Sequence, residues 1–244
     1  QESLGFFKDI SSTEWQRLKD KVASMYPNTY GHTPFSELKL QKHMASRFFQ
    51  DQFEPDFACR HERRIGRHGD GGKWVCDPHR IQQANDCLVY SVGSNGDVSF
   101  EQAIKSQIGS HCEIHTFDMG NYTQVVEQTG AHFHPWGISH QSTTDQRGRV
   151  YKTLEQTVKE LDHVGRTIDI FKIDCEGCEW TTYPSFFTAG VELRQVLIEL
   201  HSGQPEKPNS PHRPMPPETV DFFEAMYQNG YVIFHKEVNI RFWH

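Results

Sequence analysis

From residue 87 onward, the chain alternates short apolar runs with stretches in which apolar positions recur every three or four residues. The short runs have the length and composition of strands, whereas the longer stretches have the periodicity of amphipathic helices. Predicted helices cover 98–108, 122–130 and 153–164, and predicted strands cover 87–92, 112–118, 131–138, 168–174 and 194–201. This alternation predicts right-handed βαβ units and a parallel sheet covered on both faces, which is a doubly wound α/β fold.

The two ends of the chain have different patterns. Residues 1–62 contain two helical patterns, STEWQRLKDKV, which opens with a capping box from Ser11 to Glu14, and SELKLQKHMASRFFQDQF. We expect a helical extension here, packed on a main domain that covers 63–244. Near the other end, PETVDFFEAMYQNG predicts a helix between an initial proline and Gly230. The final YVIFHKEVNIRFWH has two strand-like runs, which predict a hairpin that adds one antiparallel strand to the sheet.

Charge and hydropathy restrict the classes of function. The formal charge of −7 over 244 residues argues against nucleic-acid binding, which needs a clustered excess of Lys and Arg. We expect the basic run at 60–68 to be a solvated loop. The apolar runs are too short to span a bilayer, so no membrane segment is predicted. The chain starts at Gln1 rather than Met, which suggests a trimmed protein and leaves a removed signal or anchor as an open alternative.

The sequence contains six cysteines, at positions 59, 76, 87, 112, 175 and 178. In a chain of this length we do not expect a disulfide scaffold, although Cys87 and Cys112 begin adjacent predicted strands and could be bonded. Cys175 and Cys178 form a single C-x-x-C in FKIDCEGCEW, which lacks the four ligands of structural zinc. This pair follows a late strand instead of opening a helix after the first one, so a redox role is disfavoured. The sequon at Asn121 carries little weight.

Two features at the predicted strand ends favour an adenosine cofactor. The first strand leads into SVGSNG, where Gly93 and Gly96 let a ligand approach the backbone beside a helix start. The second strand ends at Asp118, where a carboxylate can accept both ribose hydroxyls. A tight turn without a ligand explains the glycines equally well when they are considered alone. The glycines and Asp118 together favour the cofactor site.

Three further polar side chains are expected at the same edge of the sheet. Asp174 ends one strand, and Glu199 and His201 alternate to one face at the end of the next strand. Together they predict either a site for a hard cation or a general-base cluster. The structural alternatives are a helix-capping role for Asp174 and a satisfied hydrogen-bonded network.

Several of these segments together resemble a known family. IDCEGCEW looks like the D-x-E-G-x-E segment of FkbM-type S-adenosylmethionine-dependent methyltransferases. RIGRHGDGGKWVCDP, YSVGSNGDVSFE, IHTFD, HPWGIS and LIELH are similar to the eukaryotic methyltransferase-like branch that is predicted to act in the secretory pathway. The resemblance covers residues 64–201 and departs from the family pattern at Ser91, because an acidic residue often ends this strand.

The resemblance implies a fold, a reaction and a location. The fold is a Rossmann-like methyltransferase sheet with a closing antiparallel strand. The reaction is methyl transfer from S-adenosylmethionine to a hydroxyl, with a sugar or glycan as the leading acceptor. The location is the secretory pathway, the Golgi lumen or the outside of the cell, and a cytoplasmic location stays open.

The resemblance also implies cofactor contacts. The residues concerned are Gly93, Ser94, Asn95, Gly96, Asp118, Trp136, Gly137 and Lys73. The four turn residues would surround the methionine part, Asp118 would hold the ribose, and Trp136 with Gly137 would flank the adenine. Lys73 in DGGKW could pair with the cofactor carboxylate, and Asp70 could reach cofactor or acceptor. A glycine-rich surface turn is an equally good account of that segment.

Methyl transfer to a hydroxyl requires removal of its proton, because an alcohol is a poor nucleophile at neutral pH. Two routes are open: His201 as general base, or a divalent cation on Asp174, Glu199 and His201 that acidifies and orients the hydroxyl. We favour the cation, for which these ligands suit Mg²⁺ or Mn²⁺, with Glu176 and Glu179 in supporting positions.

The rival functions are an NAD-dependent oxidoreductase, disfavoured by the missing third glycine, and a non-catalytic glycan-binding or scaffold domain of the same fold.

Overall fold

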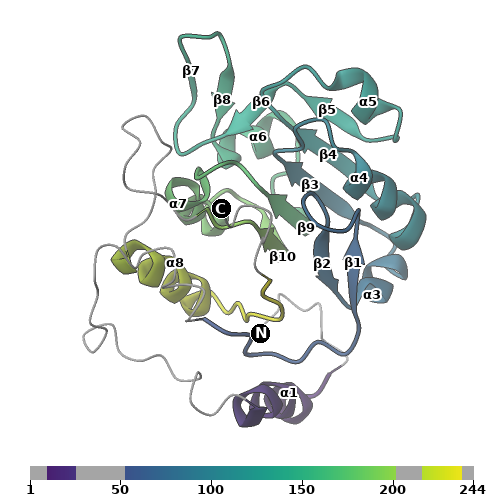
Figure 1. Cartoon of the computed structure of the whole chain (residues 1–244), viewed down its shortest axis with the longest axis vertical. Helices are drawn as coiled ribbons and strands as arrows, with labels where there is room; N and C mark the ends of the chain where they lie inside the picture. The colour runs from purple at the N-terminus through teal and green to yellow at the C-terminus, as the bar shows by residue number, and fades with distance from the viewer. Residues whose placement is uncertain (1–9, 26–52, 202–215, 238–244) are drawn as a thin grey trace.

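The computed structural model describes residues 10–25, 53–201 and 216–237. Its centre is a five-stranded parallel sheet in the order β10-β9-β3-β4-β5 (Figure 1). The strands are β3 (Leu88–Val92), β4 (Glu113–Phe117), β5 (His132–His134), β9 (Thr167–Ile173) and β10 (Glu192–Ile198). The predicted α/β fold of Rossmann-like type is confirmed.

The strand order reverses between β3 and β9. From β3 the chain adds β4 and β5 on one side, and it then returns to place β9 and β10 on the other side. Every residue of β3, and every residue of β9 except Thr167, is buried, because helices cover both faces of the sheet. Doubly wound sheets bind ligands beyond the carboxyl ends of the strands at such a reversal. The residues that follow β3 and β9 are therefore the first place to look for a site.

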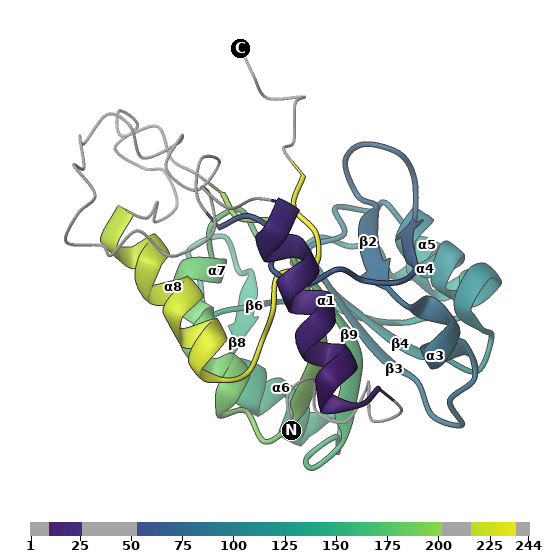
Figure 2. The ribbon, with the colours of Figure 1, turned by 90° about the horizontal axis from the view of Figure 1, so that it is seen from below.

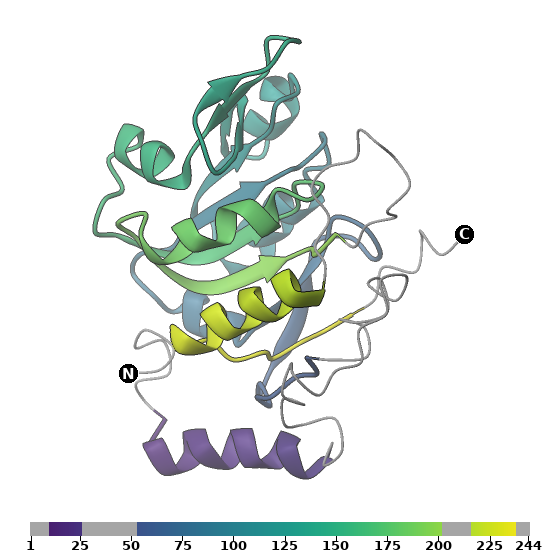
Figure 3. The same cartoon turned by 90° about the vertical axis from the view of Figure 1, so that its left-hand side faces the viewer.

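The two faces of the sheet are covered by different helices (Figures 1 and 3). One layer consists of α3 (Pro78–Gln82), α4 (Ser99–Ala103), the π-helical turn η4 (Ile104–Ile108) and α5 (Thr123–Glu127). The other layer consists of α6 (Leu154–Glu160), α7 (Glu179–Thr182) and the 3-10 turn η5 (Tyr183–Phe187). Phe100 of the first layer shares a core with Val89, and Val158 of the second shares a core with Tyr90, since successive strand residues face opposite sides. No helix in the described ranges is long and apolar enough to cross a membrane.

An antiparallel hairpin of β1 (Glu62–Ile65) and β2 (Lys73–Cys76) lies beside the main sheet. The prediction of a solvated loop at 60–68 is therefore wrong for its central residues. Ile65 is fully buried, and Arg64 forms an ion pair with Glu237 at 2.6 Å. This basic segment is a strand because it pairs with β2 along its whole length, with one apolar side chain buried and one charge paired.

Pro135 divides the predicted strand 131–138 into two parts. The first part is β5, and the second is β6 (Trp136–Ile138), which leaves the main sheet. It joins β8 (Val150–Lys152) and β7 (Thr143–Thr144) in a three-stranded sheet in the order β6-β8-β7. A proline lacks the N–H that a continuous strand would need at this point.

The first predicted N-terminal helix is confirmed as α1 (Ser12–Met25). Its cap is the predicted one, because the Ser11 hydroxyl accepts a hydrogen bond from the Glu14 N–H at 3.1 Å. Leu18 packs with Phe57, so α1 lies against the chain segment that leads into the hairpin (Figures 2 and 3). The second helical pattern, apart from its last residue, lies outside the described residues. The division into an extension and a main domain stays a prediction.

The predicted C-terminal helix is α8 (Pro216–Gln228), in which Phe222 packs against Trp180. The antiparallel closing strand is wrong for the described part of the chain, because residues 231–237 contain no strand. Ile233 instead bonds through its backbone to Asp56, with N···O distances of 2.6 and 2.7 Å. The remaining predicted strand residues, 238–244, lie outside the described residues.

All six cysteines are paired, contrary to the expectation that they form no disulfide scaffold. The bonds are Cys59–Cys76, Cys87–Cys112 and Cys175–Cys178. The second of these is the pair that the predicted strand starts had suggested. The three bonds tie the hairpin to its preceding segment, the start of β3 to the start of β4, and the two ends of the C-x-x-C loop to each other.

Candidate active site

The turn after β3 brings the carboxyl ends of β3 and β9 into contact. Gly93 and Gly96 have φ angles of +79° and +78°, a region that favours glycine. A Cβ atom on Gly93 would lie 1.6 Å from the carbonyl oxygen of Asp174, so no larger residue fits there. Ser94 is buried and Asn95 is exposed. The predicted cofactor turn therefore lies at the reversal of strand order.

Asp118 follows β4 and holds this turn from the side. Its Oδ2 accepts a hydrogen bond from the Asn95 N–H, and its Oδ1 accepts one from the Gly120 N–H, both at 2.8 Å. The Tyr122 hydroxyl donates to the side-chain oxygen of Asn95 at 3.0 Å. Each carboxylate oxygen keeps a second lone pair for another donor. Asp118 is thus fixed and partly exposed, as a residue that accepts ribose hydroxyls should be.

Asp174 follows β9 and lies in a cluster of charged residues from three elements. The Nζ of Lys73, in β2, lies 2.5 Å from Glu199 Oε2 and 3.7 Å from Asp174 Oδ2. Asp70, in the hairpin loop, offers a carboxylate oxygen within 4.8 Å of those of Asp174 and Glu199. Burial raises the pKa of Asp174 to about 6, and repulsion from Glu199 adds to the rise.

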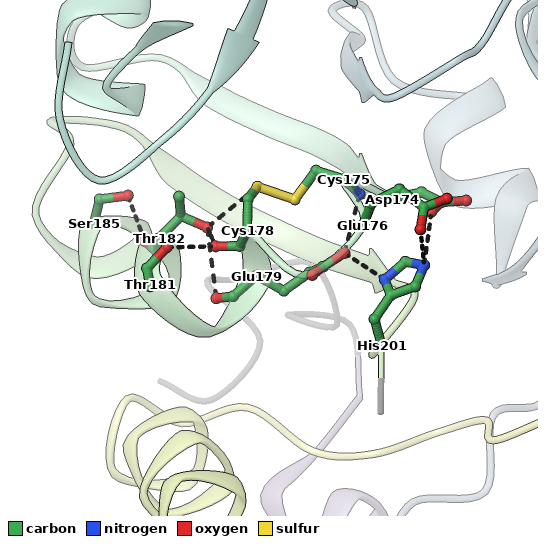
Figure 4. Close-up of a disulfide and its surroundings, with 9 residues drawn as sticks. All are labelled: Asp174, Cys175, Glu176, Cys178, Glu179, Thr181, Thr182, Ser185 and His201. Atoms are coloured by element: carbon green, nitrogen blue, oxygen red, sulfur yellow. Dashed lines mark hydrogen bonds and ion pairs between the residues drawn. A yellow bond between two sulfur atoms is a disulfide. The ribbon is translucent and has the colours of Figure 1, made fainter. Parts of the chain in front are cut away.

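A second interaction reaches Asp174 from His201 (Figure 4). His201 Nε2 lies 3.6 Å from Asp174 Oδ1, and its Nδ1 lies 3.0 Å from Oε1 of the fully buried Glu179. The same Glu179 oxygen accepts a hydrogen bond from the Cys175 N–H at 3.0 Å. Burial alone would lower the pKa of His201, but the hydrogen bond to Glu179 and the nearby carboxylates outweigh it and raise the pKa to about 9. His201 is therefore protonated at neutral pH.

The predicted metal ligands Asp174, Glu199 and His201 are arranged as two clusters that share Asp174. Glu199 lies with Asp174 on one side, and His201 lies with Glu179 on the other. The ammonium group of Lys73 already contacts both Glu199 and Asp174, and His201 carries a proton. A divalent cation would have to displace these positive charges. These residues therefore fit Mg²⁺ or Mn²⁺ poorly.

The remaining predicted cofactor residues lie at two places. Lys73 is held by protein carboxylates, as described above. Trp136 begins β6. The Lys152 Nζ lies 3.7 Å from the centre of the Trp136 ring, and Trp136 Nε1 donates a hydrogen bond to the Thr157 hydroxyl at 3.3 Å. A Cβ atom on Gly137 would lie 3.1 Å from the side chain of Met119, the residue after Asp118. This contact joins β6 to the end of β4, while the adenine-flanking role stays a prediction.

Buried polar residues beneath the turn are not among the sequence-based candidates. Lys172 of β9 is buried in register with Ser91 of β3, and its Nζ lies 3.5 Å from the Gly93 carbonyl oxygen. Glu101 of α4 is fully buried and accepts a hydrogen bond from the Thr116 hydroxyl at 3.2 Å. Ser91 Oγ and Glu101 Oε2 have no hydrogen-bond partner among the described residues. Unpaired buried polar atoms are uncommon in folded proteins, and these two lie in β3 and α4, beneath the turn. In the sequence, a lysine inside the apolar run IFKID was the one local sign of this buried polar group.

A family model described as a methyltransferase domain (Methyltransf_22) matches residues 1–243. Comparisons with curated proteins and with solved structures gave no match. The family match includes the helical N-terminal region, the turn after β3 and both strand-end aspartates. The chain therefore belongs to this methyltransferase family.

Proposed function

We propose that the protein transfers a methyl group from S-adenosylmethionine to a hydroxyl group of a sugar or glycan. Membership of a methyltransferase family supports methyl transfer over the hydride transfer of nicotinamide enzymes. The hydroxyl acceptor rests on the resemblance of residues 64–201 to FkbM-type enzymes, which commonly methylate sugar or polyketide hydroxyls. The observation that carries the proposal is Asp174, a carboxylate with a raised pKa in backbone contact with the glycine turn.

The residues around the turn fit S-adenosylmethionine. Asp118 keeps free lone pairs, and the buried Ser91 hydroxyl has no hydrogen-bond partner among the described residues. The cofactor, when bound, supplies a methyl group on a positively charged sulfur. The contribution of the chain is to hold the cofactor in one orientation through Asp118 and the turn. The acceptor would then lie on the Asp174 side of Gly93.

Asp174 is the residue best suited to take the proton of the acceptor hydroxyl. With a pKa of about 6 it is ionised at neutral pH and more basic than an ordinary aspartate. Lys73 and protonated His201 contact its two different oxygens, at 3.7 and 3.6 Å, and hold the carboxylate in place. His201 itself cannot accept a proton at neutral pH, since its pKa is about 9. We therefore assign the base to Asp174 and positioning roles to His201 and Lys73.

We further propose that the protein acts in the secretory pathway or outside the cell. All six cysteines are paired, and disulfides persist in oxidising compartments. The sequon residue Asn121 is exposed, as an attached glycan would require. Glycoconjugate acceptors are also found in these compartments.

The proposal is tested by calorimetric titration with S-adenosylmethionine and S-adenosylhomocysteine, followed by transfer of a labelled methyl group to a panel of glycans. Asp118→Ala should abolish cofactor binding, because the turn loses its anchor. Asp174→Asn should bind cofactor normally and lose at least about 100-fold in turnover, as expected for a missing general base. Asp20→Asn, on the exposed surface of α1, is the matched control and should change neither.

Two results would contradict parts of this proposal. A folded sample that binds neither ligand but binds sugars would be a non-catalytic glycan-binding domain. Turnover that is lost with a chelator and restored by Mg²⁺ or Mn²⁺ would return a cation to the site. We expect turnover to be unchanged by either metal.

A further inference from the structure

A second group of ligating side chains lies away from the candidate active site, near the start of β4. Glu113 begins β4, and His115 faces the same side of the sheet two residues later. His163 lies in the turn after α6. Oε1 of Glu113 lies 2.9 Å from His115 Nε2 and 3.2 Å from His163 Nε2. The three donor atoms lie within 4.8 Å of one another, and the two histidines are only 6% and 4% exposed.

The two distances from Glu113 Oε1 to the histidine nitrogens are close to the distances between neighbouring ligand atoms of a tetrahedral zinc ion. Ligands bonded at about 2.0–2.1 Å in a tetrahedron lie about 3.3 Å from one another. The two distances from Glu113 Oε1, 2.9 and 3.2 Å, therefore need to lengthen only slightly to admit Zn²⁺. The side chain of Glu113 is 35% exposed, so water can reach a fourth coordination position.

The outer contacts of the cluster are those of a metal site. His115 Nδ1 lies 2.8 Å from His134 Nε2, and His163 Nδ1 lies 2.7 Å from the Tyr90 hydroxyl. Both ring nitrogens that face away from Glu113 are thus held by a hydrogen bond. Ligating histidines are oriented in this way by a partner on the second nitrogen.

Both of these partners can adapt to a metal. Without an ion, each Nε2 donates its proton to Glu113, and each Nδ1 accepts one from Tyr90 or His134. With an ion on Nε2, each Nδ1 carries the proton and donates it instead. The Tyr90 hydroxyl can accept as well as donate, and the His134 imidazole can change its tautomer. No hydrogen bond to the second ring nitrogens is lost when the ion enters.

The charges around the cluster also permit a cation. Arg166 contacts Glu113 through the other carboxylate oxygen, Oε2, at 2.7 Å, and leaves Oε1 to face the histidines. Asp86 lies 3.3 Å from Arg166 and balances part of its charge. His132 stacks on the His115 ring at 5.0 Å.

We propose that Glu113, His115 and His163 bind a Zn²⁺ ion that fastens the turn after α6 to β4. The site lies near the amino end of β4, whereas Asp118 and the cofactor turn lie at its carboxyl end. It is separate from the Asp174 cluster and does not depend on the proposed methyl transfer.

The test measures zinc on the full chain. The protein is stripped with a chelator, titrated with ZnCl₂ by calorimetry, and analysed for metal content after dialysis. We expect one Zn²⁺ per chain that is absent from His163→Gln, and a 10- to 100-fold weaker affinity in Tyr90→Phe, which removes only an outer contact. Cobalt substitution should give the visible absorption of a tetrahedral site. His140→Gln, an exposed histidine outside the cluster, and Asp174→Asn should bind zinc like the unchanged protein.

Two results would overturn the proposal. The first is a folded chain that binds no zinc in the titration and yields no cobalt spectrum. The second is zinc binding that is unaffected by both His163→Gln and Tyr90→Phe, since the ion would then lie elsewhere. If His163→Gln fails to fold, Tyr90→Phe and the cobalt spectrum still decide between the outcomes.

Discussion

Gly93 and Asp174 are in contact through their main chains, because a Cβ atom on Gly93 would stand 1.6 Å from the Asp174 carbonyl oxygen. This contact joins the two halves of the candidate site. The turn that begins at Gly93 is tied to Asp118, whereas Asp174 is tied to Lys73 and His201. A change at the contact should therefore disturb cofactor binding and proton removal together.

Gly93→Ala should be strongly destabilising. The substitution adds a steric clash with the Asp174 backbone to the strain of an L residue at φ +79°. Gly148→Ala separates these two effects, because Gly148 has φ +76° and nothing within 4 Å of the added Cβ. We expect a loss of about 1–2 kcal/mol for Gly148→Ala from the left-handed backbone alone. Gly93→Ala should lose more than about 3 kcal/mol in urea unfolding, and equal losses would show that the close contact does not exist.

The rate of methyl transfer should depend on pH in a bell-shaped manner. Asp174 must be ionised to accept a proton, so turnover should rise through about pH 6. His201 must stay protonated to hold Asp174, so turnover should fall through about pH 9. Turnover measured from pH 5 to 10 with saturating cofactor checks both limbs. The residual activity of Asp174→Asn should lack the lower limb, and persistence of that limb would assign it to another group.

Glu179→Gln should lower the pKa of His201 and shift the upper limb of the rate profile toward neutral pH. Glu179 is fully buried and 3.0 Å from the ring, whereas Glu176 is exposed and 3.7 Å away. Solvent screens the exposed carboxylate, so Glu176→Gln is the matched control and should leave the profile nearly unchanged. If the two variants shift it equally, the buried hydrogen bond is not what holds the His201 proton.

The free energy of unfolding should also depend on the protonation of His201. The pKa of His201 lies above its ordinary value, so its contribution is fully present below about pH 6.5 and is lost as the pH rises through about 9. The free energy of unfolding should fall over this interval by on the order of 2 kcal/mol. In His201→Gln that dependence should be absent. Urea unfolding at pH 6 and pH 9.5 compares the two proteins, and parallel behaviour would mean that the imidazole is not paired in the folded state.

The sequence is sufficient for the parts of the fold whose strands are mostly apolar. β3 and β9 are buried on both faces and are marked by apolar runs with few polar residues, and the residues after them lie at the same edge of the sheet. The β1–β2 hairpin contains instead a basic segment with one buried apolar residue, Ile65, and an ion pair between Arg64 and Glu237, 173 positions apart. No local pattern contains that pairing.

Only part of the candidate site, likewise, could be predicted from local sequence patterns. Local pattern placed Asp118 and Asp174 correctly, because each directly follows a strand of the parallel sheet. The grouping of Asp174 with Glu199 and His201 as one set of metal ligands depends on what lies between them. Lys73 comes from an upstream hairpin and occupies that space, and the burial of Glu179 follows from packing of α7. Distant segments decide both points.

The disulfide between Cys175 and Cys178 should matter more for activity than for stability. It closes a loop with a sequence separation of 3, whereas Cys87 and Cys112 are separated by 25. Loop entropy predicts losses of about 2 kcal/mol and about 3.5 kcal/mol when each bond is replaced by two serines. The Cys175 N–H, however, donates to Glu179, which holds the His201 ring beside Asp174.

Loss of the Cys175–Cys178 bond should therefore reduce turnover by about tenfold or more, because Glu179 and His201 would be misplaced. The Cys87→Ser and Cys112→Ser double variant should unfold more readily, yet keep its turnover when folded. Urea unfolding and labelled methyl transfer, measured on both double variants, give the two quantities independently. Full turnover in the Cys175→Ser and Cys178→Ser double variant would mean that the backbone around Glu179 keeps its geometry without the bond. In that case the loop is held by Glu179 itself, whose carboxylate accepts from both Cys175 and His201.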